Sequence, residues 1–143
     1  MKIGYMTLVW TLCAASLTTA CGKAPGSDAP DPADGPVTIV VPDNLDDLVA
    51  DGDAKKGEAL FATKGCRACH LLTAVKLVGP GLEGVGKRRS VRWMARMMLK
   101  PEVMVKEDPQ AKLLLGIHMV AMANQNVAVD TELPHLLAFL KTR

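Results

Sequence analysis

Residues 66 to 70 read Cys66-Arg67-Ala68-Cys69-His70. Two thiols separated by two residues, with a histidine directly after the second, form the attachment signature of a c-type haem. The two sulfurs can bond to the two vinyl groups of one porphyrin, and the imidazole can ligate its iron. Because this interpretation uses all three reactive side chains, we predict one haem bound covalently by Cys66 and Cys69, with His70 as an axial iron ligand.

A pair of cysteines at this spacing also occurs in zinc sites and in redox dithiols. A zinc site needs further soft ligands, and a redox dithiol of the thioredoxin type needs a βαβ pattern around it. The other cysteines, Cys13 and Cys21, lie far upstream, and the other histidines, His118 and His135, are scattered in the sequence. We therefore favour haem over both alternatives.

Residues 1–20 have the features of an export signal. A basic start at Lys2 precedes an apolar stretch from Tyr5 to Leu17. This stretch is shorter than the roughly 20 apolar residues that cross a bilayer, so we predict a secretory signal peptide rather than a membrane span. Export agrees with the haem prediction, because c-type haem is attached outside the cytoplasm.

Cys21 follows Leu17-Thr18-Thr19-Ala20, which resembles a bacterial lipoprotein box with Thr18 in the place of a bulky aliphatic residue. In such a box the cysteine becomes the acylated N-terminus, whereas the alternative is ordinary cleavage after Ala20. We expect lipidation of Cys21, and hence a protein anchored on the periplasmic side of a bacterial membrane. Gly22 rather than Asp after the cysteine resembles the sorting pattern of the outer membrane.

From residue 21 to residue 51 the composition shifts to Gly, Pro, Ala, Ser and Asp, with seven aspartates and a single lysine. Such a segment buries too little apolar surface to fold, so we predict a flexible acidic linker that carries the lipid anchor. The short run Val37-Thr38-Ile39-Val40-Val41 could pack on the domain or add a strand to a partner. We expect it to be extended, with no binding role.

The folded domain is expected at residues 52–143 as an all-α unit of about four to five helices around the haem. Capping residues set the predicted boundaries. Asp53 precedes a helix over 54–64 that Gly65 ends, and Ser90 precedes a helix over 91–99 that Pro101 ends. Two further helices are predicted, from residue 108 or 109 to 115 before Gly116, and from residue 130 or 131 onward.

Several residues near the haem signature are candidates for holding the cofactor. Ligating histidines usually donate their other ring N–H to a carbonyl. Pro80 lies in a turn-forming run and is the candidate to present that carbonyl to His70. Arg88, Arg89 or the indole N–H of Trp93 could contact the haem propionates.

Arg88, Arg92 and Arg96 recur every four residues, so they would line one side of any helix that includes them. A charge run of this kind usually marks a solvated face. In a redox carrier it can also be a docking patch.

Over about residues 52–143 the chain resembles the class I monohaem cytochromes c. This resemblance implies a small cytochrome c fold in which Gly57 and Phe139 lie where the first and last helices cross. The matching motifs around the haem signature are Gly57-Glu58-Ala59-Leu60-Phe61, Gly79-Pro80-Gly81-Leu82, Met122-Ala123-Asn124-Gln125-Asn126 and Leu136-Leu137-Ala138-Phe139-Leu140.

The same resemblance implies that Met122 is the distal iron ligand. Members of the family usually have proline after this methionine, and Ala123 departs from that pattern. Met119 and His118 lie near enough in sequence to be alternatives, and an open distal site is a further one.

The resemblance and the ligand set predict an electron-transfer protein rather than an enzyme. A thioether opposite an imidazole gives six-coordinate iron that can pass one electron without binding oxygen. One alternative is a haem sensor or a peroxidase-like protein with an open distal iron site. Another is a copper site built from His118, Met119 and Met122.

Charge points to acidic redox partners rather than to nucleic acid. Residues 52–143 contain fifteen Lys and Arg against eight Asp and Glu, a formal charge of +7, although the whole chain carries +2. A positive domain favours fast, salt-sensitive docking to an acidic surface. Residues 88–115 look like those of small cytochromes often associated with copper-containing respiratory reductases, such as nitrous oxide reductase, so such a reductase or an oxidase is the expected partner.

Overall fold

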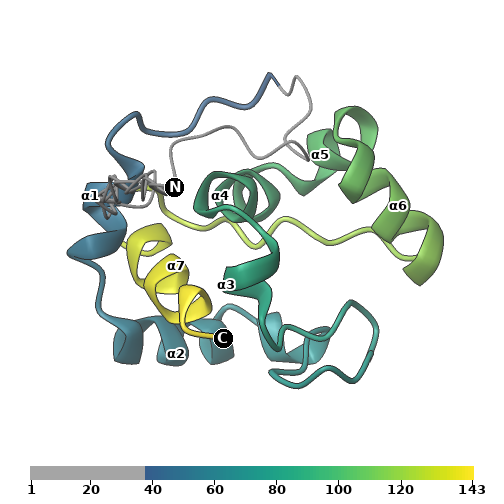
Figure 1. The fold of residues 1–143 in the computed structure, drawn as a ribbon, viewed down its shortest axis with the longest axis horizontal. Helices are drawn as coiled ribbons and strands as arrows, with labels where there is room; N and C mark the ends of the chain where they lie inside the picture. Colours follow the sequence, from purple (N-terminus) through teal and green to yellow (C-terminus); the bar gives the residue numbers. More distant parts are fainter. Residues whose placement is uncertain (1–37) are drawn as a thin grey trace, which may run out of the picture.

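The structure, a computed structural model, describes residues 38–143. The predicted signal peptide, Cys21 and the linker up to residue 37 lie outside the described residues. Within 38–143 the chain forms seven α-helices, one 3₁₀ turn and no strand, which confirms the all-α prediction (Figure 1). The elements are α1 Leu45–Ala50, α2 Ala54–Thr63, η1 Cys66–Ala68, α3 Val85–Arg88, α4 Val91–Leu99, α5 Pro101–Glu107, α6 Pro109–His118 and α7 Leu133–Lys141.

Helices α2 and α7 cross closely at Gly57, as the family resemblance implies (Figure 1). A Cβ atom at Gly57 would lie 2.7 Å from the Cβ of Phe139 and closer still to the carbonyl oxygen of His135. The rings of Phe61 and Phe139 pack next to this point, with centroids 5.6 Å apart. The absence of a side chain at Gly57 therefore sets the separation of the two helices.

Residues 38–51 belong to the folded domain, so the prediction of a flexible linker through residue 51 is wrong for this part. Ile39, Val41, Leu45 and Val49 are buried in the core, and α1 packs against α7 and α4. Ile39 and Val41 are two residues apart, as in an extended segment, and Leu45 and Val49 are four apart, as in a helix. Both spacings place apolar side chains on one face, although the average composition of the segment is acidic. The run at 37–41 thus packs on the domain from residue 38 onward.

Thr38 is fixed at the start of this segment by α5. Its backbone N–H and its hydroxyl each donate to a carboxylate oxygen of Glu107 at 2.9 Å. The backbone bond above all, and then the hydroxyl bond, lower the pKa of Glu107. The contact therefore persists at neutral pH and is lost only as the pH falls through that lowered pKa.

The caps predicted for two helices are present. The Asp53 carboxylate accepts from the backbone N–H groups of Lys55 and Lys56, and the Ser90 hydroxyl accepts from that of Trp93 at 3.0 Å. Gly65 ends α2 in the left-handed region, at φ 76°.

Three boundaries differ from the prediction. The last helix, α7, begins at Leu133 rather than at residue 130 or 131. Pro101 ends α4 but is also the first residue of α5, where its missing N–H costs nothing. Gly116 does not end α6, which continues to His118 and stops at Met119 in the left-handed region, at φ 57°.

Arg88 does not share a helix with Arg92 and Arg96. Arg88 ends α3, the backbone is extended at Arg89 and Ser90, and the other two arginines lie on α4. The four-residue repeat of arginines therefore does not form one face of a helix.

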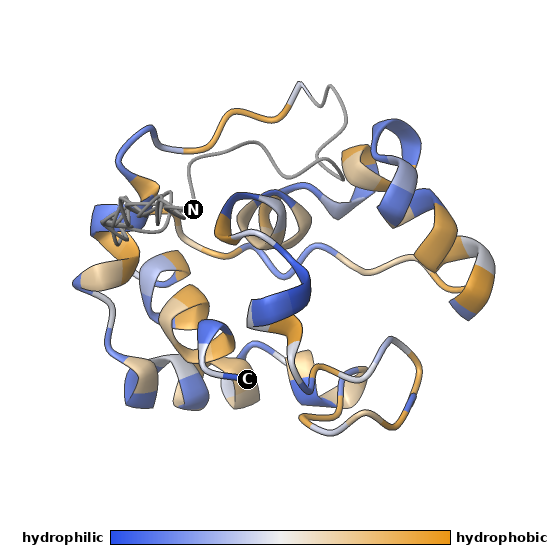
Figure 2. Cartoon of the chain, viewed as in Figure 1, coloured by the Kyte–Doolittle hydropathy of each residue, from blue (hydrophilic) through white to orange (hydrophobic). Residues whose placement is uncertain are grey.

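Figure 2 shows that α7 is rich in apolar residues and that the hydrophilic residues of α1 and α2 lie on the outside of the molecule.

Gly57→Ala should lower the free energy of unfolding of the haem-loaded protein by about 1–3 kcal/mol, because the added methyl group overlaps α7. Denaturant titration followed by circular dichroism measures the change. The matched control is Gly116→Ala, also in a helix, where a Cβ meets nothing within 4 Å. Equal losses in the two variants would show that the crossing does not depend on Gly57.

Candidate haem site

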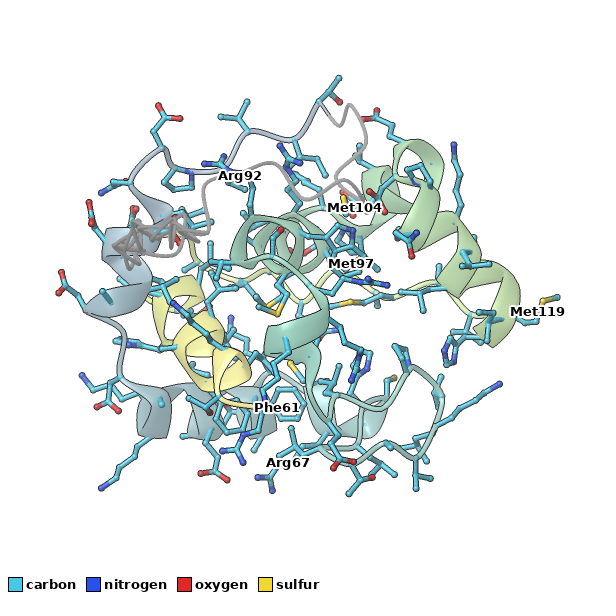
Figure 3. The ribbon with its side chains drawn as sticks, viewed as in Figure 1. Phe61, Arg67, Arg92, Met97, Met104 and Met119 are labelled. Carbon is cyan, nitrogen blue, oxygen red and sulfur yellow. The ribbon has the colours of Figure 1, made fainter. Side chains whose placement is uncertain are left out.

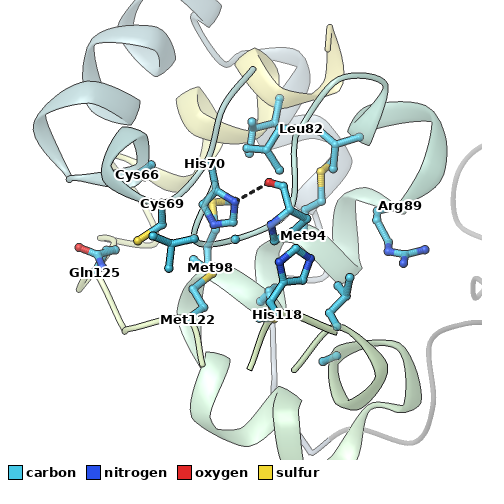
Figure 4. Close-up of a pocket in the computed structure, with 18 of the residues that line it drawn as sticks. Cys66, Cys69, His70, Leu82, Arg89, Met94, Met98, His118, Met122 and Gln125 are labelled. Carbon is cyan, nitrogen blue, oxygen red and sulfur yellow. Dashed lines mark hydrogen bonds between the residues drawn. The ribbon is translucent and has the colours of Figure 1, made fainter. Parts of the chain in front are cut away.

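A cavity of about 430 Å³ lies between the attachment signature and the segment that links α6 to α7 (Figure 4). Its volume falls in the range of small-molecule sites. Cys66, Cys69 and His70 contribute to one wall, and His118 and Met122 contribute to another. The remaining lining is largely apolar, as a porphyrin ring requires, and includes Leu82, Trp93, Met94, Met97, Met98, Leu136 and Leu140.

The turn after α2 brings both thiols to the cavity. The N–H groups of Cys69 and His70 both donate to the carbonyl of Cys66, at 3.2 and 2.9 Å, which winds the signature into one tight turn. Both thiols are free and half-buried. Burial raises the pKa of the Cys66 thiol.

His70 is held by the turn at residues 79–81. Its Nδ1–H donates to the carbonyl oxygen of Pro80 at 3.0 Å, which is the contact predicted from the sequence (Figure 4). This bond leaves the lone pair of Nε2 for a metal. Gly79 packs against the ring, since a Cβ there would lie 2.6 Å from Cε1 of His70.

Met122 is half-buried in the segment between α6 and α7 and lines the cavity. The residues after it are fixed by Asn124, whose Nδ2 donates to the carbonyl of Leu99 at 3.0 Å. Its Oδ1 accepts from the N–H of Asn126 at 2.8 Å, which allows Asn126 its left-handed φ of 51°. The sequence analysis missed this role, although asparagines two and four residues after Met122 are a turn signal.

Lys64 and Glu132 attach the same segment to α2. The Lys64 ammonium lies 2.7 Å from the Glu132 carboxylate and donates to the carbonyl of Asn126 at 3.2 Å. The carboxylate also accepts from the N–H of Ala128 at 2.8 Å. This backbone bond and then Lys64 lower the pKa of Glu132, so its carboxylate is charged at neutral pH.

The alternative distal ligands, Met119 and His118, differ in their position relative to the cavity. Met119 is 81% exposed and points away from the cavity at the end of α6 (Figure 3), so the proposed copper set of His118, Met119 and Met122 is not brought together. His118 does line the cavity. Its Nδ1 is buried and has no hydrogen-bond partner among the described residues.

The indole N–H of Trp93, predicted to contact a propionate, has a partner within the protein, and its contact with a propionate stays a prediction. Trp93 is buried, and its indole N–H donates to Oδ1 of Asp108 at 3.1 Å. The same oxygen caps α6 by accepting from Ala111 N–H at 2.7 Å. The indole therefore joins α4 to α6, a pairing that no local pattern in the sequence indicates.

Arg88 and Arg89 both line the cavity. The Arg88 guanidinium donates to the carbonyls of Glu83 and Gly81, whereas Arg89 donates to Gln110 and lies over the ring of Trp93. Each guanidinium has five N–H donors and keeps some of them free of these bonds. Their contact with propionates stays a prediction.

Within residues 38–143 no three His, Cys, Asp or Glu side chains are grouped as a metal site would need. Nor is any helix of these residues long and apolar enough to span a bilayer.

An all-helical domain in which two thiols and a histidine open onto one apolar cavity defines a small protein that binds haem covalently. No family model and no curated protein matches the chain. Solved structures do match it. A cytochrome c from Rhodothermus marinus is 29% identical, with 76% of this chain and 88% of that one covered and a TM-score of 0.59.

Two structures of an engineered form of that cytochrome c are similar as well. One is 28% identical with a TM-score of 0.58, covering 76% of this chain and 89% of that one. The other, bound to a carbene intermediate, is 30% identical with a TM-score of 0.51, covering 76% and 88%. The chain belongs to the cytochrome c family, and its cofactor is haem c.

Gly79→Ala should displace the His70 ring from its position against the turn at residues 79–81. We expect less of the exported chain to carry low-spin haem and a loss of about 1–3 kcal/mol in unfolding free energy. Absorption spectra and haem-stained gels measure both the amount and the state of the haem. Val75→Ala, an exposed change in the same loop, is the control, and equal spectra for the two variants would contradict the prediction.

Proposed function

We propose that the protein is a one-electron carrier whose haem iron has His70 and Met122 as axial ligands. One observation carries the proposal: the oriented imidazole and the thioether line the same apolar cavity onto which both thiols open (Figure 4). Imidazole opposite thioether leaves the iron no vacant position and raises its potential. Such a site exchanges electrons and does not bind oxygen.

The residues of the chain contribute orientation and a low dielectric. The Pro80 carbonyl fixes the tautomer and the orientation of His70. The buried apolar side chains of α4 and α7 disfavour the extra positive charge of the oxidised state, which raises the potential further. Neither contribution requires the chain to move during electron transfer.

Hydrogen bonds around Met122 argue against the alternative of an open distal site. It rests on Ala123, which lacks the fixed φ of the usual proline. Asn124 and the Lys64–Glu132 pair hold the same segment by hydrogen bonds to α4 and α2. These bonds restrain the backbone after Met122, as the fixed φ of a proline at position 123 would.

A second ligand set is favoured by one specific observation. Nδ1 of His118 is buried beside the cavity without a partner among the described residues, so this imidazole could ligate the iron in place of Met122. The variants Met122→Ala and His118→Ala distinguish between the two ligands.

The proposed partners are acidic redox proteins outside the cytoplasm, such as an oxidase or a copper-containing reductase, with the chain anchored through a lipid on Cys21. Extending the domain to residue 38 changes its charge, because 38–143 contain fifteen Lys and Arg against twelve Asp and Glu, a formal +3. The four added aspartates lie in or next to α1, at the opposite end of the molecule from α6 (Figure 1). The charge is therefore uneven, which supports oriented docking.

Met122→Ala should open the distal position of the iron. We expect loss of the thioether-to-iron charge-transfer band, a lower reduction potential and ready binding of carbon monoxide by the reduced protein. Met119→Ala, an exposed methionine, should change none of these. If Met122→Ala leaves the spectrum intact and His118→Ala abolishes it, the ligand is His118 and this part of the proposal fails.

Asn124→Ala should loosen the Met122 segment without removing its thioether. The change removes two hydrogen bonds, the one to the carbonyl of Leu99 and the one from the N–H of Asn126, each worth about 1 kcal/mol. The charge-transfer band should therefore disappear at a lower temperature, and Ala123→Pro in the same chain should restore part of the loss. Asn44→Ala, before α1 and without a side-chain capping bond, is the control. An unchanged midpoint for the band in Asn124→Ala would refute the role of this asparagine.

A further inference from the structure

Asp108, at the corner between α5 and α6, is the one charged side chain among residues 38–143 that is buried in the core (Figure 1). Its exposed fraction is 0%. Aspartates are almost never buried completely unless the charge is paired, because removing a carboxylate from water is costly. Yet no Lys, Arg or His of the described residues forms an ion pair with Asp108.

The two oxygens of this carboxylate differ in their partners. Oδ1 accepts from the indole N–H of Trp93 at 3.1 Å and from the backbone N–H of Ala111 at 2.7 Å. Oδ2 is buried and has no hydrogen-bond partner among the described residues. An asparagine could cap α6 and accept from the indole with its one carbonyl oxygen. The fold therefore uses one oxygen of Asp108 and does not need its charge.

The carboxylate lies directly behind the wall of the haem cavity. Trp93 and Ala111, which donate to Oδ1, both line the cavity, whereas Asp108 does not. One residue thus separates the carboxylate from the space that the cofactor fills. Because the side chain has no contact with solvent, salt and water screen its charge far less than they screen a charge on the surface.

The hydrogen bonds around Asp108 favour its charge and do not neutralise it. The N–H of Ala111 belongs to the first turn of α6, where the helix dipole favours a negative group. The Arg89 guanidinium lies 4.9 Å from the centroid of the Trp93 ring, but it donates to Gln110 rather than to Asp108. The carboxylate therefore keeps a field that reaches the cavity.

Such a field acts on the haem because the two oxidation states differ by one charge. Oxidised iron carries one more positive charge than reduced iron, so a nearby negative charge stabilises the oxidised state and lowers the reduction potential. At an effective dielectric constant of about 20, a unit charge roughly 10 Å away changes a one-electron equilibrium roughly tenfold. The apolar wall of the cavity acts in the opposite direction.

We propose that Asp108 sets the reduction potential of the haem, with its buried carboxylate lowering the potential that the apolar cavity alone would give. The inference rests on the proposed function, because the potential is the working property of an electron carrier. Asp108 touches no cofactor and acts only through its field, while the Trp93 indole and α6 hold it in place. A lower potential makes the reduced haem a stronger electron donor.

The experiment compares the reduction potentials of full haem-loaded proteins by spectroelectrochemical titration. Asp108→Asn keeps an acceptor for both N–H groups and removes the charge, so the equilibrium should move roughly tenfold towards reduced haem, about 59 mV upward for a one-electron couple. Asp53→Asn is the matched control, because it removes an exposed charge that also caps a helix, and it should leave the potential unchanged. The shift in Asp108→Asn should persist in about 1 M salt, which screens surface charges.

A second variant separates the charge from the hydrogen bond. Trp93→Phe removes the indole donor and keeps the carboxylate, so it should not raise the potential. If the role of Asp108 were only structural, both variants would disturb the same contact and shift the potential in the same direction. A rise in Trp93→Phe equal to that in Asp108→Asn would therefore overturn the inference.

An unchanged potential in Asp108→Asn with an intact low-spin spectrum would also overturn it, as would an equal shift in Asp53→Asn. If too little Asp108→Asn protein carries haem, Asp108→Ser replaces it with the same expectation, since serine also caps a helix. The carrier function has its own test. Reduced wild type that readily binds carbon monoxide would refute the proposed ligand pair, while the effect of Asp108 on the potential could still be measured.

Discussion

The close contact of α2 with α7 at Gly57 is the constraint on which the site depends. Because only Lys64 and Gly65 separate α2 from the turn that carries Cys66 and Cys69, the position of α2 along α7 also fixes the position of both thiols. Leu136 and Leu140 of α7 line the cavity, so the same helix that receives Gly57 also forms part of the wall. One missing side chain thus aligns the attachment residues with the surface that holds the cofactor.

Local signals made much of the fold and of the proximal site predictable. Caps such as Asp53 and Ser90 act within three residues, and the turn from Gly79 to Pro80 needs to reach back only about ten residues to meet His70. The attachment signature is local as well. Each of these features depends on neighbours that the sequence shows directly.

Contacts between distant segments could not be predicted in the same way. The pairing of Trp93 with Asp108, and that of Asn124 with Leu99, joins elements whose relative position only the folded chain defines. The segment from Ile39 to Val49 folds onto the domain because the spacing of its apolar residues, rather than its acidic average composition, decides its burial. Pro101 shows that one residue can end a helix and begin the next.

The contact between Thr38 and Glu107 also sets the reach of the domain from any anchor at Cys21. A chain cannot span more than about 3.3–3.6 Å per residue. Counted to Asp51, the thirty intervening steps would allow roughly 100 Å, but the seventeen steps to Thr38 allow roughly 60 Å. A lipidated chain would therefore search for its partners in a much thinner layer above the membrane, and it would leave the domain beside α5 rather than at the start of α2.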